Sequence, residues 1–483
     1  MVFSSIIFLF LFLPLTLTLY FLTGKKRRNL FLLFASLIFY AWGEGFYLFI
    51  LLISIFINYS CGLLIDHHRG SKRSSVYLAV AIVLNLGILA LFKYANFVVA
   101  NLNSILAVFG SGQLFLAPVH LPIGISFFTF QALSYVIDVY NQKTTAQRNV
   151  INLGAYISLF PQLMAGPIVR FAHIAKEMVS RTVSRTDFAE GVKQFLFGLG
   201  KKMLIANPVA LVADQVFSLP TGELTTGLSW LGAVCYTLQI YFDFSGYSDM
   251  AIGVARMFGF HYLENFNYPY ISRSIREFWR RWHISLSTWF RDYLYIPLGG
   301  NRRGPIRTYI NLIIVFLLCG LWHGASWNFV IWGLFHGLFL ATERTSLGRG
   351  INAFPQPFRH IYTLLIVMVG WVIFRTESMT HAISYLSAMS GFASGSGVKY
   401  DVAMFLSDKL KLEIGMGIIL STPLYPMIKR MEVSILKTRP AKLNAPLNVI
   451  FNFVGFVLLS IMVYASLISL AISAYNPFIY SRF

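Results

Sequence analysis

The residue most able to do chemistry in this 483-residue chain is His323, which lies near the middle of an uncharged apolar stretch, 309–341. An ionisable side chain at membrane depth is costly and by default marks a functional pathway. Neutral imidazole accepts a proton near neutral pH, and burial favours the neutral form further. His323 is therefore a candidate general base, and the alternative is a histidine that donates a hydrogen bond to a neighbouring helix. For His336, on another helical face, we expect that structural role.

A second candidate region is the arginine-rich segment 273–307. On one continuous helix, five polar residues would fall within about 80° of one another: Arg276, Arg280, His283, Ser287 and Arg291. The opposite side would carry Phe278, Trp282, Leu286, Trp289 and Tyr293. This pattern predicts an interfacial helix with aromatic anchors and a cationic face. That face either rests on anionic lipid headgroups or binds the phosphates of a cytoplasmic ligand, which suit the planar fork of arginine.

Two carboxylates, Asp243 and Asp249, also lie in an apolar segment. Their spacing would place them about 120° apart on a helix, so they do not form a paired-carboxylate site. They could pair with buried arginine or, with Ser287 and Trp322, line a polar funnel. We expect a structural role for the two carboxylates.

Several enzyme classes are excluded by motif. The sequence contains no HExxH, no Walker A and no GxSxG motif, and no histidine is followed by aspartate five positions on. Cys61, Cys235 and Cys319 lie singly in apolar runs, so we expect neither a disulfide framework nor a metal site.

The composition predicts an integral membrane protein. Only 12% of the residues are charged and 57% are hydrophobic, whereas soluble domains carry about 25% charged residues. The net charge of +20 could suggest nucleic acid, but positive-inside loops explain an excess of Lys and Arg in a charge-poor chain. We therefore expect an all-α polytopic protein, one membrane domain over 1–483, with about 10–12 transmembrane helices plus re-entrant or interfacial helices.

The loop charges predict the orientation. Basic residues 25–28 follow the first apolar stretch, 2–22, so this stretch is expected to be a retained span and not a cleaved signal peptide. The loop 43–46 lacks positive charge and the next loop is basic, which places the N-terminus outside. A basic loop before the last apolar stretch, 447–474, places the tail 476–483 outside as well, although Arg482 argues weakly against this.

The segments WRRWHISLSTWFRDYLYIPLGGNR (279–302) and GLWHGASWNFVIWGLFHG (320–337) resemble the membrane-bound O-acyltransferase (MBOAT) family. The closer resemblance is to its bacterial branch of alginate and peptidoglycan O-acetyltransferases and the teichoic-acid D-alanyl transferase. Supporting stretches include FKYANF (92–97), LPIGISFFTFQALSYVIDVY (121–140), FPQLMAGPIVR (160–170) and YFDFSGYSDMAIG (241–253).

The resemblance implies a central tunnel between a cytoplasmic donor site and an external acceptor site. It implies that His323 is catalytic and that His283 is a second site histidine, positioning the thioester or the oxyanion. We expect Arg276, Arg280 and Arg281, with Arg291 nearby, to hold an acetyl donor such as acetyl-CoA, without a tightly bound cofactor. Alginate is the first acceptor expected and another cell-envelope glycan the second. The location would be the bacterial inner membrane, and an exported transferase partner would complete the modification.

The tail F-I-Y-S-R-F (478–483) resembles the aromatic motif of the small partner protein in teichoic-acid D-alanylation. This implies that Tyr480 is an acyl-relay candidate, and the alternative is an aromatic anchor at the membrane interface.

Three other functions remain open. The first is a transporter or channel, although we find no internal repeat. The second is an MBOAT enzyme acting on lipid or protein, and the third is a membrane scaffold.

Overall fold

The computed structural model describes residues 2–393, 395, 399–438, 441–472 and 475–477, with the side chains of 438 and 441–445 excepted. Within these residues the chain is helical and contains no strand, which confirms the predicted all-α class. The first part of the chain forms η1 (Phe8–Phe12), α1 (Leu13–Leu22), η2 (Lys25–Arg27), α2 (Arg28–Glu44), η3 (Gly45–Tyr47), α3 (Leu48–His67), α4 (Lys72–Val108), α5 (Ile125–Tyr140), α6 (Val150–Ser158), α7 (Phe160–Leu163) and α8 (Phe171–Val179).

The central part carries the helices around the candidate site. They are α9 (Arg185–Lys201), η4 (Lys202–Ala206), α10 (Asn207–Phe217), η5 (Thr221–Glu223), α11 (Thr226–Met257), η6 (Pro269–Ile271), α12 (Ile275–Arg281), α13 (Ile284–Phe290), η7 (Arg291–Tyr295), α14 (Pro305–His323) and α15 (Trp327–Thr342). The last part forms α16 (Ser346–Ala353), α17 (Gln356–Arg375), α18 (Met379–Met389), α19 (Val402–Phe405), α20 (Asp408–Leu420), α21 (Leu424–Thr438) and α22 (Ala441–Ile472).

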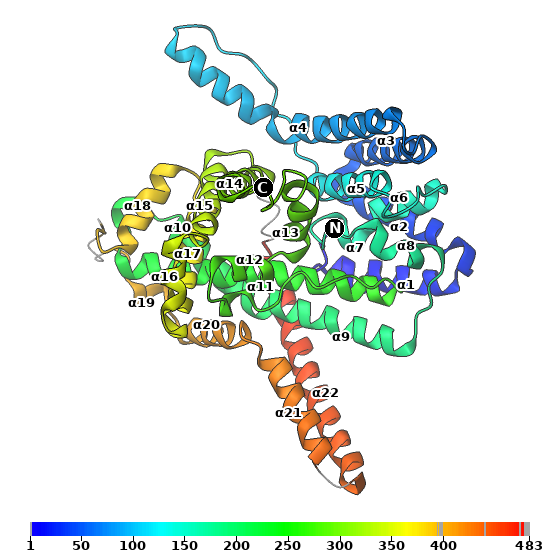
Figure 1. The fold of residues 1–483 in the computed structure, drawn as a ribbon. Helices are drawn as coiled ribbons and strands as arrows, with labels where there is room; N and C mark the ends of the chain where they lie inside the picture. Colours follow the sequence, from blue (N-terminus) through cyan, green and yellow to red (C-terminus); the bar gives the residue numbers. More distant parts are fainter. Residues whose placement is uncertain (1, 394, 396–398, 439–440, 473–474, 478–483) are drawn as a thin grey trace.

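The long helix α11 runs through the middle of the molecule and is buried over most of its length (Figure 1). Helix α9 lies beside it, and small residues set the distance between the two. A Cβ atom at Gly198 would lie 2.5 Å from the carbonyl oxygen of Gly246, and one at Gly191 would lie 2.7 Å from that of Gly253. Small residues at such crossings let membrane helices approach closely.

Two parts extend away from this body. Helix α4 projects on one side, and α21 with α22 projects on the other (Figure 1). Helix α22 exposes apolar residues such as Phe453, Phe456 and Ile461. Exposed apolar surface on such helices is expected where lipid is the solvent.

Six stretches in the described part of the chain are helical, long and apolar enough to cross a membrane. They are Lys25–His67, Lys72–Val108, Arg185–Phe217, Pro305–His323, Gln356–Arg375 and Pro446–Ile472. Three shorter apolar helices are Phe8–Leu22, Ile125–Tyr140 and Trp327–Thr342. The chain is therefore a multi-pass membrane protein, and the expected 10–12 crossings and the outward termini stay predictions.

Candidate active site

His323 is the last residue of α14, at the tip of a close hairpin formed with α15. Gly324 continues in extended conformation, and α15 begins at Trp327. Gly320 and Gly324 predict a break near the middle of the stretch 309–341. The structure places the break at Gly324, whereas Gly320 lies inside α14. A Cβ at Gly320 would overlap the carbonyl group of Phe329, so this glycine allows the two helices to approach.

Aromatic rings enclose the His323 side chain, which is 5% exposed. The imidazole centroid lies 5.0 Å from the ring centroid of Trp322, 5.1 Å from that of Trp332 and 5.3 Å from that of Phe374. The histidine thus occupies a largely apolar environment, in which a neutral imidazole is favoured over a charged one.

The prediction of one continuous amphipathic helix over 273–307 is wrong. The chain forms α12 and α13, separated at Trp282 and His283, and His283 has left-handed backbone angles of φ 44° and ψ 55°. The predicted grouping of His283 with Arg276 and Arg280 on one exposed face therefore fails, because His283 is fully buried. The aromatic side was expected to anchor the helix in the membrane interface. It faces the protein interior: Trp289 stacks on Phe130 with ring centroids 3.8 Å apart.

Asn265 explains the break and orients His283. Its backbone oxygen accepts the N–H of Ile284 at 2.9 Å, and its Oδ1 accepts the N–H of Ser285 at 3.1 Å. Since a backbone N–H can only donate, the atom facing Ser285 must be the amide oxygen. The same Oδ1 lies 3.2 Å from Nδ1 of His283, which must therefore carry the ring proton. The Nε2 of His283 then presents a lone pair, and this buried atom has no hydrogen-bond partner among the described residues.

The two histidines meet at Trp322. The ring centroid of Trp322 lies 6.1 Å from that of His283 and 5.0 Å from that of His323. The indole Nε1 is buried and has no hydrogen-bond acceptor in the described part of the chain. Burial lowers the pKa of His283, outside the six candidate spans, to about 3. Two imidazoles and one unused indole N–H therefore gather in one buried place.

Arg276 and Arg280 lie one turn apart on α12 and are exposed. Burial and the neighbouring guanidinium groups of Arg344 and Arg280 lower the pKa of Arg276, although Glu343 opposes this. Neither Arg276 nor Arg280 takes part in an ion pair within the described residues. Glu343 instead accepts the backbone N–H groups of Ile275 at 2.6 Å and Arg276 at 3.0 Å, which holds the start of α12. The result is a cationic face available to an anion.

Arg281 and Arg291 have partners already. Arg281 pairs with Glu277 at 2.9 Å and donates to the carbonyl oxygen of Asn267 at 3.1 Å. Arg291 is exposed and pairs with the adjacent Asp292 at 2.6 Å. Side-chain charge at these positions is therefore partly neutralised, in contrast to Arg276 and Arg280.

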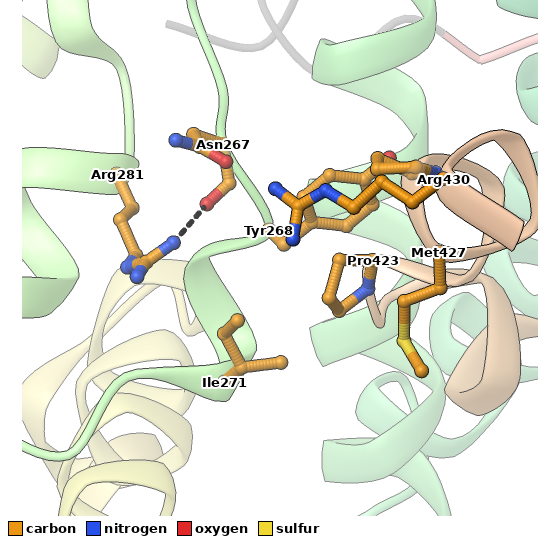
Figure 2. A pocket seen from close by; sticks show the side chains of 8 residues that line it. Asn267, Tyr268, Ile271, Arg281, Pro423, Met427 and Arg430 are labelled. Carbon is orange, nitrogen blue, oxygen red and sulfur yellow. Dashed lines mark hydrogen bonds between the residues drawn. The ribbon is translucent and has the colours of Figure 1, made fainter. Parts of the chain in front are cut away.

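Arg281 also lines a cavity of about 320 Å³ between the segment before α12 and helix α21. Figure 2 shows Arg281 on one side of this cavity and Arg430 on the other. The lining residues are Asn267, Tyr268, Ile271, Arg281, Pro423, Pro426, Met427 and Arg430. With two guanidinium groups in its wall, the cavity suits an anionic group.

The remaining funnel candidates are held in structural contacts. Asp243 pairs with Lys202 at 2.7 Å, both side chains being 2% exposed, and Asp249 pairs with Lys201 at 2.6 Å. The partners are thus lysines and not the arginines considered from sequence. Ser287 donates to the carbonyl oxygen of Trp282 at 3.3 Å. Of the four funnel candidates, only Trp322 lies between the two histidines.

The half-buried residues just before the aromatic tail are hydrogen-bonded to the body of the molecule. The Asn476 amide donates to the backbone oxygen of Ser4 at 2.8 Å and accepts from the Asn207 amide at 3.3 Å. The next residue, Pro477, accepts a hydrogen bond from Lys202 through its carbonyl oxygen. Tyr480, the relay candidate, lies outside the described residues.

His336 is fully buried between Trp279, at 5.2 Å, and Trp332, at 5.0 Å between ring centroids. We expected it to donate a hydrogen bond to a neighbouring helix. Neither ring nitrogen has a hydrogen-bond partner in the parts of the chain that the structure describes, so its contacts there are with aromatic rings. Across those same parts, no group of three or more His, Cys, Asp or Glu side chains could hold a metal ion.

Sequence reasoning missed the residues that hold the site in place. Asn265 orients His283. Glu343 accepts a backbone hydrogen bond at the start of α12, and Lys93 donates a hydrogen bond to the end of α14. Lys93 lies in the stretch 92–97 that resembles the family, but residue type alone indicated no role for Lys93 or for Asn265. Their contacts cross long sequence separations, which helical periodicity cannot reveal.

Comparison with known proteins identifies the family of this chain. The model of MBOAT, the membrane-bound O-acyltransferase family, matches residues 34–384. The chain is 44% identical over 490 residues to a probable alginate O-acetylase AlgI of Pseudomonas putida, covering 100% of both chains. It is 50% identical to that of Pseudomonas aeruginosa, over 82% of this chain and 76% of the relative. It is 35% identical to a peptidoglycan O-acetyltransferase of Helicobacter pylori, over 81% of this chain and 80% of the relative. The chain therefore belongs to the membrane-bound O-acyltransferase family and is a multi-pass membrane acyltransferase.

Proposed function

We propose that this enzyme moves an acetyl group from a cytoplasmic thioester to an exported polysaccharide, with alginate as the acceptor. The main support for this type of reaction is that the buried side chains of His283, Trp322 and His323 lie next to one another. The choice of alginate is supported by the AlgI-named relative that matches the chain over its full length.

His323 acts as the general base in this proposal. Its neutral imidazole takes the proton of the attacking hydroxyl while the hydroxyl oxygen bonds to the acetyl carbonyl carbon. When the tetrahedral intermediate collapses, the C–S bond breaks and the protonated imidazole returns the proton to the leaving thiolate. A positioned base of this kind contributes roughly 10²–10⁴-fold to the rate.

His283 and Trp322 supply complementary groups beside that base. With its proton directed to Asn265, His283 offers an acceptor at Nε2, which suits the positioning of a hydroxyl or thiol. A neutral imidazole in this form does not donate to an oxyanion through Nε2. The unused Nε1–H of Trp322 can donate to the developing oxyanion. We therefore assign positioning of the reactants to His283 and oxyanion stabilisation to Trp322.

The donor enters on the cationic side. Arg276 and Arg280 present free guanidinium groups to the phosphates of a donor such as acetyl-CoA, and Arg344 adds positive charge beside them. Arg281 and Arg291 contribute less because carboxylates already neutralise them. The cavity beside Arg281 and Arg430 provides room for an anionic part of the donor. We propose a soluble acetyl thioester as a substrate and no tightly bound cofactor.

The tail supports a relay through Tyr480. Its support is that hydrogen bonds of Asn476 and Pro477 hold the chain against the body of the molecule, three residues before Tyr480. In this scheme the Tyr480 hydroxyl attacks the acetyl carbonyl, the thiol leaves, and the resulting aryl ester passes acetyl to a second hydroxyl. Tyr480→Phe should then lose acetylation of the polymer, and unchanged acetylation would rule out the relay. Phe478→Leu is the matched control, since it also alters the aromatic tail but keeps the hydroxyl.

The acceptor lies outside the cell membrane in this proposal. The enzyme would sit in the bacterial inner membrane with both termini external, and an exported transferase would complete the placement of acetyl on the polymer. Peptidoglycan is the second acceptor, favoured by the 35% identity to the Helicobacter pylori enzyme over most of both chains.

The deciding experiment uses membranes containing this enzyme and acetyl-CoA labelled in the acetyl group. Label is measured on added alginate, on peptidoglycan fragments and on the enzyme, with and without the co-expressed exported transferase. Label on alginate supports the first acceptor, and label on peptidoglycan alone selects the second. An unconsumed donor under all conditions contradicts the proposed acetyl transfer.

A further inference from the structure

Lys93 is a buried lysine on α4 that the proposed reaction does not use. Four residues of α4 form a buried stripe with one residue in each successive turn: Ala81, Asn85, Leu89 and Lys93. Most of the remaining surface of this helix is exposed. The stripe ends at Lys93, which is 8% exposed and reaches the end of α14.

The contact falls on the backbone of the turn that carries His323. The Nζ of Lys93 donates to the carbonyl oxygen of His323 at 3.2 Å and to that of Trp322. The next residue, Tyr94, donates its hydroxyl proton to the carbonyl oxygen of Leu321 at 2.6 Å. The last carbonyl groups of a helix have no intrahelical partner and carry its negative dipole end, so donors there stabilise the terminus. Two adjacent side chains thus bind three consecutive carbonyl groups.

The hydrogen bonding of Lys93 is complete. Its third acceptor is the hydroxyl oxygen of Ser126 on α5, at 3.1 Å. Three acceptors match the three N–H donors of an ammonium group. Lys93 takes part in no ion pair among the described residues, so its hydrogen-bond partners there are neutral oxygens, and its Nζ also lies 5.7 Å from the centroid of the Trp322 ring. One side chain therefore joins α4, α5 and the end of α14.

A lysine buried without a carboxylate is a costly way to join helices, since an apolar residue fills the same space without loss of hydration. What lysine adds here is direction, because its hydrogen bonds fix the carbonyl groups of Trp322 and His323. A misplacement of about 1 Å at a reacting group can cost about 10²-fold in rate. The side chains of these two residues are the base and the oxyanion donor of the proposed reaction.

We propose that Lys93 is a positioning residue that sets the orientation of His323 and Trp322 by fixing the C-terminal turn of α14, with Tyr94 as its helper. The inference rests on the proposed function of His323. Lys93 acts through the backbone and does not touch the substrate in this account.

The test compares Lys93→Met with Asn85→Ala in the full-length enzyme reconstituted in vesicles. Asn85 occupies the same stripe and pairs with Asn58 at 3.0 Å, away from α14. Both substitutions weaken the packing of α4 against its neighbours. Only Lys93→Met also removes the hydrogen bonds to the end of α14. We expect Lys93→Met to lower kcat by about 10- to 100-fold with little change in KM for acetyl-CoA. Asn85→Ala should lower the thermal stability while kcat per folded enzyme stays near wild type.

Two further variants keep the result clear if Lys93→Met folds poorly. Lys93→Arg retains donors and should recover part of kcat, and Tyr94→Phe removes only the hydrogen bond to Leu321 and should cause a smaller loss. A wild-type kcat in folded Lys93→Met, or an equal loss of kcat per folded enzyme in Asn85→Ala, overturns the positioning role. Full activity of His323→Gln would instead show that the proposed function fails, so the two failures are distinguishable.

Discussion

The side-chain nitrogen of Lys93 lies 3.2 Å from the carbonyl oxygen of His323, although 230 positions separate the two residues in sequence. A comparable contact holds the other histidine, because Asn265 binds Nδ1 of His283 at 3.2 Å. One histidine is thus fixed through its backbone and the other through its ring. Their shared neighbour Trp322 is bound by Lys93 through its carbonyl group. The geometry of the site therefore depends on residues outside the two histidine motifs.

Removing the side chain of Asn265 should impair catalysis more than substrate binding. Asn265→Ala deprives the Nδ1–H of His283 of its acceptor and releases the N–H of Ser285. We expect kcat to fall by about 10- to 100-fold with KM for acetyl-CoA little changed, as measured by initial rates in vesicles. Ser285→Ala is the control, because it removes only a hydroxyl donor to the same oxygen. Equal losses in both variants, or a folded Asn265→Ala enzyme with full kcat, would argue against this role.

Neutralising the free arginines of α12 should weaken donor binding. In Arg276→Gln with Arg280→Gln, we expect KM for acetyl-CoA to rise by roughly tenfold or more, since a hydrogen bond to a charged group contributes about 1.5–3 kcal/mol. The effect should shrink as salt is added, because ionic strength screens exposed charges. Initial rates across donor concentrations at low and high salt measure both effects.

The control for this change removes the same kind of charge elsewhere. Arg69 pairs with Asp66 in the turn after α3, outside the candidate site, so Arg69→Gln should leave KM unchanged. If Arg69→Gln raises KM as much as the α12 double variant does, general surface charge and not this cationic face attracts the donor.

Adding one methyl group at Gly320 should disturb the hairpin that carries His323. The Cβ of Gly320→Ala would overlap the carbonyl group of Phe329 and force α14 and α15 apart. Overpacking of this kind costs about 1–3 kcal/mol, so thermal unfolding in detergent should begin at a lower temperature and transferase activity should fall. In Gly87→Ala, the added Cβ meets open space on α4, and the same measurements should match wild type. An unchanged unfolding temperature in Gly320→Ala would contradict the close contact.

The sequence alone was sufficient to predict the helical membrane class and the interruption of 309–341. Low charge and long apolar runs indicate that a helix is surrounded by lipid, and this property depends only on residues that are neighbours in sequence. The same local reasoning failed at 273–307, where helical periodicity placed His283 beside the arginines. Asn265 offers hydrogen bonds that replace those of a continuous helix, and its effect depends on a loop that packs against α13.

The partners of the charged residues could not be predicted for a related reason. The apolar residues around Asp243 predict that its carboxylate is buried, but nothing in the same helix indicates that Lys202 is its partner. In the sequence, Lys93 is likewise a single cation in a long apolar helix. Its contact with the end of α14 is evident only from the tertiary structure. Position in an uncharged apolar stretch made His323 a candidate, and family resemblance added His283. The contacts that orient the two side chains follow only from tertiary structure.

The most direct test of the central claim is the release of CoA thiol from acetyl-CoA by vesicles that contain His323→Gln, in the presence of an accepting polysaccharide. His336→Gln is the matched control, because it makes the same substitution at a fully buried histidine on the same hairpin. The account predicts that His323→Gln loses at least about 100-fold in rate while it remains folded, and that His336→Gln retains most of its activity. Thiol release by folded His323→Gln at the rate of wild type would contradict the assignment of His323 as the base.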